Sequence, residues 1–369
     1  MARISQVEIF KADIPLKSAF KHSLKKRTIS ESIFVKIELD NKITGFGESL
    51  PRPYVTGNTQ GMVFDSLTAF SPRLIGVEIK DQDASTRFIK NIQITEAEAR
   101  CATEIAFLDC LGKVFTKPVY ELLGGPQETK FVYSAVISGE APLKVALISL
   151  LAKRHKCEFV KLKVGLKNDF LRLRLCRSLL KAVDLRVDAN GAWDKYKALE
   201  MIEKFRKFNI SCIEQPTPKN DFTCLKEVAD ACDEPIIADE SVCTKADALK
   251  LAQMKACDMF NIRLSKCGGI FGSLDIIKIA QDYNIGFQIG CHVGETGVLS
   301  AAGRHLAGAV NGFKFLEGSY ARFILKEDII VEDLTPKNSI ARALTNPGLG
   351  VTIKEEVLRK YTKKSQLIK

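Results

Sequence analysis

The sequence predicts a parallel (β/α) barrel of eight strands, preceded by a smaller unit of mixed strands and helices. From residue 131 onward, short β-prone apolar runs recur with starts roughly 24 to 28 residues apart, and stretches with helical spacing lie between them. Eight such runs are the number of strands that closes a barrel. An open doubly wound sheet is the alternative. Such a sheet usually carries a Gly-x-Gly-x-x-Gly turn after its first strand, and the sequence has none.

The N-terminal unit covers residues 1–125 and has strands first and helices afterwards. Alternating apolar and polar residues predict strands, and apolar residues at helical spacing predict helices. The expected strands are 7–14, 32–39 and 42–48, and the expected helices are 60–73 and 96–115. The Leu-Gly-Gly-Pro stretch at 123–126 separates this unit from the barrel, because glycine and proline interrupt regular structure.

The barrel is expected over residues 126–325, and residues 326–369 follow it as a C-terminal segment. The β-prone runs begin at residues 131, 159, 185, 210, 235, 259, 286 and 313, and two of the helices between them are expected over 170–182 and 195–208. The C-terminal segment contains a turn-forming stretch at 346–350 and further β-prone residues. We therefore expect this segment to return to the N-terminal unit and complete it.

The composition excludes several classes of protein. Apolar residues make up 46% and charged residues 27% of the 369 residues, which is typical of a globular protein with a large core and excludes intrinsic disorder. The longest apolar run, 145–152, is far shorter than the roughly 20 residues of a membrane span. The N-terminus lacks the features of a signal peptide. We therefore expect a cytoplasmic protein that does not bind membranes.

The cysteines and histidines form no metal-binding or redox motif, and the net charge does not indicate a nucleic-acid-binding surface. The 11 cysteines form no Cys-x-x-Cys pair and are expected to be free, because disulfides are rare in a reducing compartment. The four histidines are scattered. The net charge of +11 raises the alternative of a nucleic-acid-binding protein. The positive charge is spread along the chain without an aromatic-interleaved basic motif, so we expect no nucleic-acid partner.

Charged residues recur at equivalent places on successive predicted strands. Lys161 and Lys163 lie two apart on the second strand, so both point to the same side, into the mouth of the barrel. From Lys163 through the next four charges, the successive spacings are 25, 26, 25 and 27 residues, which matches the structural repeat. These four charges are Asp188, Glu214, Asp239 and Lys266. Active sites of such barrels lie at the carboxyl ends of the strands, so this registry predicts a site there.

The residue types predict the chemistry of that site. Three carboxylates that converge from adjacent strands repel one another unless a cation lies among them. Oxygen ligands without histidine or cysteine favour Mg²⁺, one ion per subunit. Lysines on either side of the metal can act as bases if burial and neighbouring cations lower their pKa. This arrangement suits removal of a proton α to a carboxylate, with the metal stabilising the enediolate that results. A barrel that has lost catalysis is the alternative, but all five expected polar positions are filled.

Five motifs in this order resemble the muconate-lactonizing-enzyme subgroup of the enolase superfamily. They are Lys-Leu-Lys at 161–163, Asp-Ala-Asn at 188–190, Glu-Gln-Pro at 214–216, Asp-Glu-Ser at 239–241 and Ser-Lys-Cys-Gly-Gly at 265–269. The resemblance implies an enolase-like fold, a (β/α)7β modified TIM barrel under an α+β capping domain. It also implies a base pattern known in that superfamily, with Mg²⁺ beside lysine.

The resemblance assigns roles to the charged residues. It implies that Asp188, Glu214 and Asp239 bind Mg²⁺. It implies that Lys163 and Lys266 are the two acid/base catalysts. Lys161 then helps to hold the carboxylate of the substrate and its enediolate form. Members of the subgroup are often oligomers, so a homo-oligomer is compatible with the resemblance.

Within the subgroup, residues 43–57 are similar to the capping domain of dipeptide epimerases, which invert the α-carbon of the C-terminal residue of a dipeptide. In the form that acts on L-Ala-Glu, a basic residue of a capping loop meets the Glu side chain, and Lys25 matches that place. The resemblance therefore implies an isomerase that converts L-Ala-L-Glu to L-Ala-D-Glu or acts on related L-Xaa-Glu dipeptides. A cycloisomerase and an o-succinylbenzoate-synthase-type dehydratase are alternatives, since both share the metal and the lysines.

The sequence departs from the epimerase pattern at two strands. Epimerases carry Asp-x-Asp at the end of strand eight, which binds the ammonium group of the dipeptide, whereas this chain has Leu-Glu-Gly at 316–318. The stretch after strand seven, 290–297, has one extra residue. Glu295 and Glu317 are both candidates to replace the missing anion. Ser134 matches a position that lines the substrate pocket, and His292 is either a residue of the pocket wall or a loop histidine.

Overall fold

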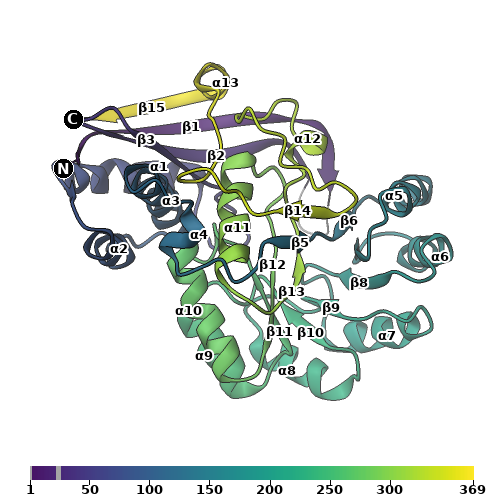
Figure 1. Cartoon of the computed structure of the whole chain (residues 1–369). Coiled ribbons are helices and arrows are strands. Elements are labelled where there is room, and N and C mark those ends of the chain that lie inside the picture. Colours follow the sequence, from purple (N-terminus) through teal and green to yellow (C-terminus); the bar gives the residue numbers. More distant parts are fainter. Residues whose placement is uncertain (1, 22–25) are drawn as a thin grey trace.

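The computed structural model describes residues 2–21 and 26–369, and it places a barrel beside an antiparallel sheet (Figure 1). The barrel strands are parallel, and each pairs with its neighbour in sequence order. They are β6 (Ala135–Ile137), β7 (Phe159–Lys163), β8 (Asp184–Asp188), β9 (Ile213–Glu214), β10 (Ile236–Ala238), β11 (Met259–Ile262), β12 (Gly286–Ile289) and β13 (Phe313–Leu316). The barrel closes because the amide of Ser134 donates to the carbonyl of Leu316 over 2.7 Å.

A helix follows each barrel strand from β6 to β12. These helices are α5 (Pro142–Arg154), α6 (Asp169–Leu179), α7 (Lys195–Arg206), α8 (Phe222–Ala231), α9 (Lys245–Met254), α10 (Gly269–Asp282) and α11 (Gly297–Ala309). The four-residue helix α12 (Ala321–Ile324) comes after the last strand. The alternation confirms the eight-stranded barrel predicted from the spacing of the apolar runs, in the (β/α)7β form that the resemblance implies. Among the described residues, no helix is both long and apolar enough to cross a bilayer.

The first predicted barrel strand is divided into two short strands. β5 (Lys130–Val132) pairs antiparallel with β14 (Ile340–Arg342) outside the barrel, and the barrel strand β6 starts at Ala135. Between them, the amide of Tyr133 donates to Ser339 while Ser134 turns to Leu316. The apolar run that begins at residue 131 therefore serves two sheets, which its hydrophobic pattern alone does not reveal.

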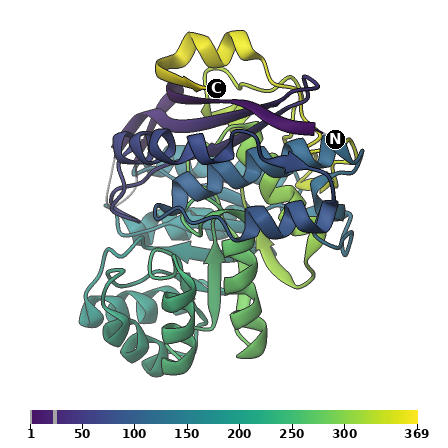
Figure 2. The same cartoon turned by 90° about the vertical axis from the view of Figure 1, so that its left-hand side faces the viewer.

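The antiparallel sheet is built from both ends of the chain. Its strand order is β15 (Thr362–Ile368), β1 (Ala2–Lys21), β2 (Lys26–Leu39) and β3 (Thr44–Ser49), with β4 (Glu78–Ile79) beside β1. Figure 2 shows this sheet between the C-terminal helix α13 (Glu355–Tyr361) and the N-terminal helices. We call residues 2–21 and 26–124 together with 355–368 the cap. The prediction that the C-terminal segment returns to the N-terminal unit agrees with the pairing of β15 with β1.

The cap helices are α1 (Gln60–Phe70), α2 (Gln82–Lys90), α3 (Ala97–Val114) and the short α4 (Val119–Leu122). The helix expected over 60–73 ends earlier, and a 3₁₀ turn, Ser71–Leu74, follows it. Pro72 lies in this turn and has no N–H to continue the α-helical hydrogen bonds, which explains the early end. The long helix α3 packs on β3 and on α10 of the barrel.

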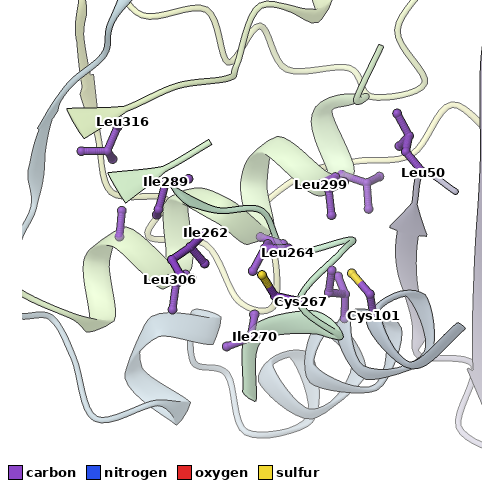
Figure 3. Close-up of a cluster of buried hydrophobic side chains, with 14 of the residues drawn as sticks. Leu50, Cys101, Ile262, Leu264, Cys267, Ile270, Ile289, Leu299, Leu306 and Leu316 are labelled. Atoms are coloured by element: carbon purple, nitrogen blue, oxygen red, sulfur yellow. The ribbon is translucent and has the colours of Figure 1, made fainter. Parts of the chain in front are cut away.

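One hydrophobic core runs from the cap into the barrel (Figure 3). Leu50 and Cys101 of the cap belong to the same buried cluster as Ile262 and Ile289 of the barrel strands. The main chain of Leu50 also exchanges hydrogen bonds with the hydroxyl of Ser265, over 2.9 and 3.2 Å. The eleven cysteines are free, and seven of them are buried.

Two buried glutamates of the cap accept hydrogen bonds from the first turns of barrel helices. Glu48 accepts from the amides of Thr296 and Leu299 at the start of α11, over distances of 3.1 to 3.2 Å. Glu104 accepts from Ile270 and Phe271 at the start of α10, over 2.5 and 3.0 Å. Free amides and the helix dipole make such ends favourable places for a carboxylate. These two glutamates therefore fasten the cap to the barrel.

We expect the stability of the protein to fall as the pH rises from about 5 to 8. Burial raises the pKa of Glu48 to about 7, against an ordinary value of 4.5, and that of Glu104 to about 8. Between the two values the folded protein holds a proton that the unfolded chain has lost, so raising the pH disfavours folding. For Glu48 the loss is on the order of 2 to 3 kcal/mol.

Urea unfolding at a series of pH values measures this effect, and Glu48→Gln is the matched variant. The free energy of unfolding of Glu48→Gln should depend less steeply on pH in this window than that of the parent. Equal slopes for the two proteins would contradict the assignment of the titration to Glu48.

Candidate active site

Three carboxylates meet at the carboxyl ends of three adjacent barrel strands. Asp188 is the last residue of β8, Glu214 is the last of β9, and Asp239 directly follows β10. All three are fully buried, and one carboxylate oxygen from each lies within 4.8 Å of the others. Like charges this close are unfavourable in a buried site unless a cation joins them. The oxygen donors match those that a hard divalent ion prefers, so this acid triad can hold a metal ion.

The side chain of Glu214 is oriented by neighbours from β7, β11 and β12. Lys161 lies 3.1 Å from both carboxylate oxygens of Glu214. The side-chain amides of Asn261 and Gln288 donate to the same carboxylate over 2.9 and 3.0 Å. Neither residue was predicted to belong to the site. Both could have been identified, because a polar residue in the middle of a buried strand is unusual.

Arg263 is a further cation at the acid triad that the sequence analysis missed. Its guanidinium donates to Asp239 and lies 3.7 Å from Glu214. It is 5% exposed and follows β11 directly. Arg263 lies three residues before Lys266, at the carboxyl end of a barrel strand. The repeat that identified the other charges could therefore have identified Arg263 as well.

The two predicted catalytic lysines contact opposite members of the acid triad. Lys163 donates to Asp188 and to the side chain of Asn190, the latter over 3.0 Å. Lys266 donates to the carbonyls of Asp239 and Val242, and its ammonium lies 3.2 Å from a carboxylate oxygen of Asp239. Because β9 separates β8 from β10, the two ammonium groups approach the triad from its two ends.

The carboxylates set the pKa values of the buried lysines. Burial lowers the pKa of Lys161, but Glu214, Glu317 and Asp188 more than offset it and hold the pKa above its ordinary value. Burial likewise lowers the pKa of Lys266, and Asp239 again more than offsets it. A bound divalent cation would oppose the effect of these carboxylates.

A cavity of about 440 Å³ lies between the acid triad and the cap. Lys161 and Lys163 lie at the barrel end of this main cavity, and Arg27, Arg52 and Tyr54 line it from the cap. Its remaining wall is mostly apolar and includes side chains of α5 and α12. Members of that wall are Ile148, Leu151, Ala152, Phe323 and Ile324. Lys25, the predicted partner of an anionic side chain, lies outside the described residues.

Each carboxylate oxygen of Glu317 accepts a hydrogen bond from a positively charged side chain. Lys161 donates to one oxygen over 2.7 Å and Arg186 to the other over 2.6 Å. Burial raises the pKa of Glu317, but the two cations lower it to about 2. Arg186 is fully buried, donates to the hydroxyl of Ser134 over 3.0 Å and lies 4.1 Å from the ring centre of Phe315. Ser134 thus lies beneath the cavity as a partner of Arg186.

We expect Arg186→Met to destabilise the protein by about 3 kcal/mol, because removal of one partner leaves part of a buried charge unpaired. Urea unfolding measures the loss. The double variant Arg186→Met/Glu317→Gln also removes the negative charge of Glu317 that has lost its partner, so it should recover part of the stability. A double variant that is less stable than the single one would contradict this account.

Glu295 is held by the loop that carries the extra residue. One of its oxygens accepts the amide of His292 over 2.6 Å, and both residues line the main cavity. Burial raises the pKa of Glu295 to about 8 and lowers that of His292 well below its ordinary value. The loop is tied to the cap, since Arg52 donates to Val293 over 2.9 Å and Ser30 to Gly294 over 2.8 Å.

Comparison with known families decides what kind of protein carries this site. The family model described as the mandelate racemase / muconate lactonizing enzyme N-terminal domain matches residues 4–124. The model described as enolase C-terminal domain-like matches residues 145–357. The chain belongs to the mandelate racemase/muconate lactonizing enzyme family. This finding confirms the resemblance that the five motifs indicated.

Relatives within the mandelate racemase/muconate lactonizing enzyme family match over the whole chain. An L-Ala-D/L-Glu epimerase of Clostridium acetobutylicum is 30% identical over 356 residues, which cover 94% of this chain and 98% of the relative. The crystal structure of a dipeptide epimerase from Cytophaga hutchinsonii, complexed with Mg and D-Ala-L-Val, has a TM-score of 0.90 at 28% identity and 100% coverage of both chains. An N-succinyl Arg/Lys racemase from Bacillus cereus has a TM-score of 0.92 at 27% identity, again with 100% coverage of both.

These comparisons confirm the enolase-like fold and the isomerase class that the resemblance implies. Magnesium is bound in the Cytophaga hutchinsonii structure, and the acid triad of this chain could hold such an ion.

Proposed function

We propose that the protein is a Mg²⁺-dependent dipeptide epimerase that inverts the α-carbon of the C-terminal residue. The observation that carries the proposal is the position of Lys163 and Lys266 at opposite ends of the acid triad. Inversion requires one group to take a proton from one face of the α-carbon and another to return a proton to the other face. Asp188, Glu214 and Asp239 are the proposed Mg²⁺ ligands.

The bound metal supplies positive charge that acidifies the α-proton of a nearby substrate carboxylate. Lys161, which already contacts Asp188, Glu214 and Glu317, is placed to hold the same carboxylate. One catalytic lysine takes the α-proton as a neutral amine and becomes an ammonium. The other, already an ammonium, gives a proton to the opposite face and becomes neutral.

The cap end of the main cavity supports an anionic side chain on the C-terminal residue. Arg27 and Arg52 are buried there, and burial, followed by the charge of Arg27, lowers the pKa of Arg52 to about 10. These arginines would pair with a carboxylate of the substrate, although Arg27 already pairs with Glu31 over 2.8 Å. L-Ala-L-Glu is therefore the proposed substrate, or a related L-Xaa-Glu dipeptide.

Glu295 is the better candidate to bind the ammonium group of the dipeptide. Both oxygens of Glu317 already accept from buried cations. Glu295 uses one oxygen for the His292 amide, and its carboxylate lines the main cavity. Contact with an ammonium would favour its ionised form.

Because both oxygens of Glu317 are already paired with cations, Glu317 is not free to bind an ammonium group. This favours a second candidate function, the racemisation of an N-acylated amino acid. Such a substrate has no ammonium group and would place its acyl chain against the apolar wall formed by α5 and α12. The Bacillus cereus relative is named for N-succinyl substrates.

Incubation with Mg²⁺ in D₂O tests the two candidates together. The panel contains L-Ala-L-Glu, L-Ala-L-Leu and N-succinyl-L-Glu, and NMR follows the α-proton. Deuterium incorporation with inversion of L-Ala-L-Glu supports the dipeptide epimerase, and a preference for N-succinyl-L-Glu supports the second candidate. Loss of water or ring formation would instead indicate a dehydratase or a cycloisomerase.

A further inference from the structure

The apolar wall of the main cavity is formed by α5 at the outer edge of the barrel and by α12 beside the cap sheet (Figure 1). The proposed function directs the carboxylate of the substrate to the barrel end of the cavity and its side chain to the arginines of the cap. It assigns an ammonium group, where there is one, to Glu295. The rest of the group on the nitrogen of the epimerised residue is then left for the apolar wall.

Helix α5 turns one stripe of apolar side chains to the cavity. Ile148, Leu151 and Ala152 line it, and their spacing of three and four residues places them on one face of the helix. Ala152 is buried, whereas Leu151 is 46% exposed. Leu147, one turn before Leu151, is 58% exposed and is not part of the described wall. The cavity therefore meets solvent along α5 at an apolar side chain.

Helix α12 adds two more apolar side chains. Phe323 and Ile324 line the cavity, and Phe323 is 60% exposed. The helix is held on both sides. The hydroxyl of Tyr320 donates to the main chain just before β6 over 2.9 Å, and the amide of Lys326 donates to the carbonyl of Pro15 in the cap over 2.9 Å. The ring of Phe323 therefore lies on a fixed element and offers an apolar surface to an occupant of the cavity.

The charges along this wall disfavour a positively charged occupant. Among the described residues of α5, α12 and 335–339 that line the cavity, none is acidic. Lys144 and His155 do line it, but both are exposed, so their polar ends can stay in water. An apolar occupant fits best, because it removes the exposed surfaces of Leu151 and Phe323 from water.

We propose that α5 and α12 form a specificity subsite for a bulky apolar group on the nitrogen of the epimerised residue. The inference rests on the proposed function and narrows its substrate class. Two kinds of substrate supply such a group: a dipeptide whose first residue has a large apolar side chain, and an amino acid with a fatty N-acyl chain. Because the wall is open to solvent at Leu151 and Phe323, a chain longer than the cavity can extend past it.

Two matched pairs of substrates test the subsite in the presence of Mg²⁺. One pair is L-Leu-L-Glu and L-Ala-L-Glu, and the other is N-octanoyl-L-Glu and N-acetyl-L-Glu. In the pair that the parent enzyme uses, kcat/KM should be about tenfold higher for the bulkier substrate, since each methylene group that leaves water contributes to binding. The pair with the higher kcat/KM identifies which kind of substrate supplies the apolar group.

Leu151→Gln and Phe323→Gln each place a polar group on the subsite. Both should reduce the preference for the bulkier substrate from about tenfold to less than about threefold. Leu147→Gln is the matched control on the same helix, outside the described wall, and should keep the preference of the parent. Each ratio compares two substrates of one variant, so a change in the amount of folded enzyme does not alter it.

Equal kcat/KM values within both pairs would overturn the inference. A preference that survives in both Leu151→Gln and Phe323→Gln, or that Leu147→Gln loses to the same extent, would also overturn it. Failure of the proposed function looks different, since the parent would then epimerise neither pair. Isothermal titration still tests the subsite in that case, because the bulkier member of a pair should bind the parent about tenfold more tightly and lose this advantage in Leu151→Gln.

Discussion

Lys163→Ala and Lys266→Ala should each abolish epimerisation, with a loss of kcat of about a thousandfold or more, because each removes one of two proton-transferring groups. Inversion needs both groups, so either loss is as damaging as the other. Each single variant should still exchange the α-proton of one epimer with D₂O, since the remaining lysine can take and return a proton on its own face. NMR of the two epimers, incubated separately, measures inversion and exchange in one experiment.

Lys144→Ala is a suitable control, because Lys144 is an exposed lysine that lines the same main cavity. This variant should invert its substrate at close to the parent rate. Full epimerase activity in either Lys163→Ala or Lys266→Ala would refute the two-base assignment. Exchange of both epimers by one of these variants would also contradict it, because one lysine would then reach both faces.

Removal of the metal should abolish the activity, and Glu214→Gln should lower it by weakening the binding of Mg²⁺. Chelation with EDTA removes the metal ion from the three carboxylates, and added Mg²⁺ should restore the rate. Glu214→Gln keeps the size of the side chain but removes one negative charge from the triad. We expect its affinity for Mg²⁺ to fall on the order of a hundredfold, which is a loss of about 3 kcal/mol of binding free energy.

Isothermal titration with Mg²⁺ measures this affinity independently of turnover. Glu295→Gln is the matched control, because it removes a buried carboxylate that lines the main cavity without belonging to the triad. Its Mg²⁺ affinity should equal that of the parent, while its KM for a dipeptide with a free ammonium should rise. Unchanged Mg²⁺ affinity in Glu214→Gln would contradict the assignment of the acid triad as the metal site.

The barrel and the acid triad could be predicted because both follow from a repeat in the sequence. One strand and one helix need about 26 residues, so the spacing of Lys163, Asp188, Glu214 and Asp239 reports their equivalent positions at the strand ends. Lys266 keeps this spacing, but it lies four residues beyond the end of β11, in the turn before α10, and not at the end of its strand as predicted. Local patterns of this kind are visible without knowledge of what packs against them.

Other features depend on contacts between distant parts of the chain and could not be predicted. The pairing of Arg186 with Glu317 joins residues 131 positions apart, and that of Glu48 with Thr296 joins residues 248 apart. No periodicity links such pairs, so the sequence left Glu295 and Glu317 as equal candidates. The cation on each oxygen of Glu317 is the reason for our preference for Glu295, and that arrangement brings together residues of strands that are not all neighbours in the sheet, since β6 lies between β7 and β13.

The pairing of β15 with β1 has a consequence for how the protein is made. Residues 362–368 leave the ribosome after the whole barrel, yet they cover the edge of a strand that precedes it. During translation that edge stays bare while the whole barrel is synthesised, and a bare edge is prone to pair with another chain. We therefore expect nascent chains stalled before residue 362 to depend on chaperones far more than completed ones.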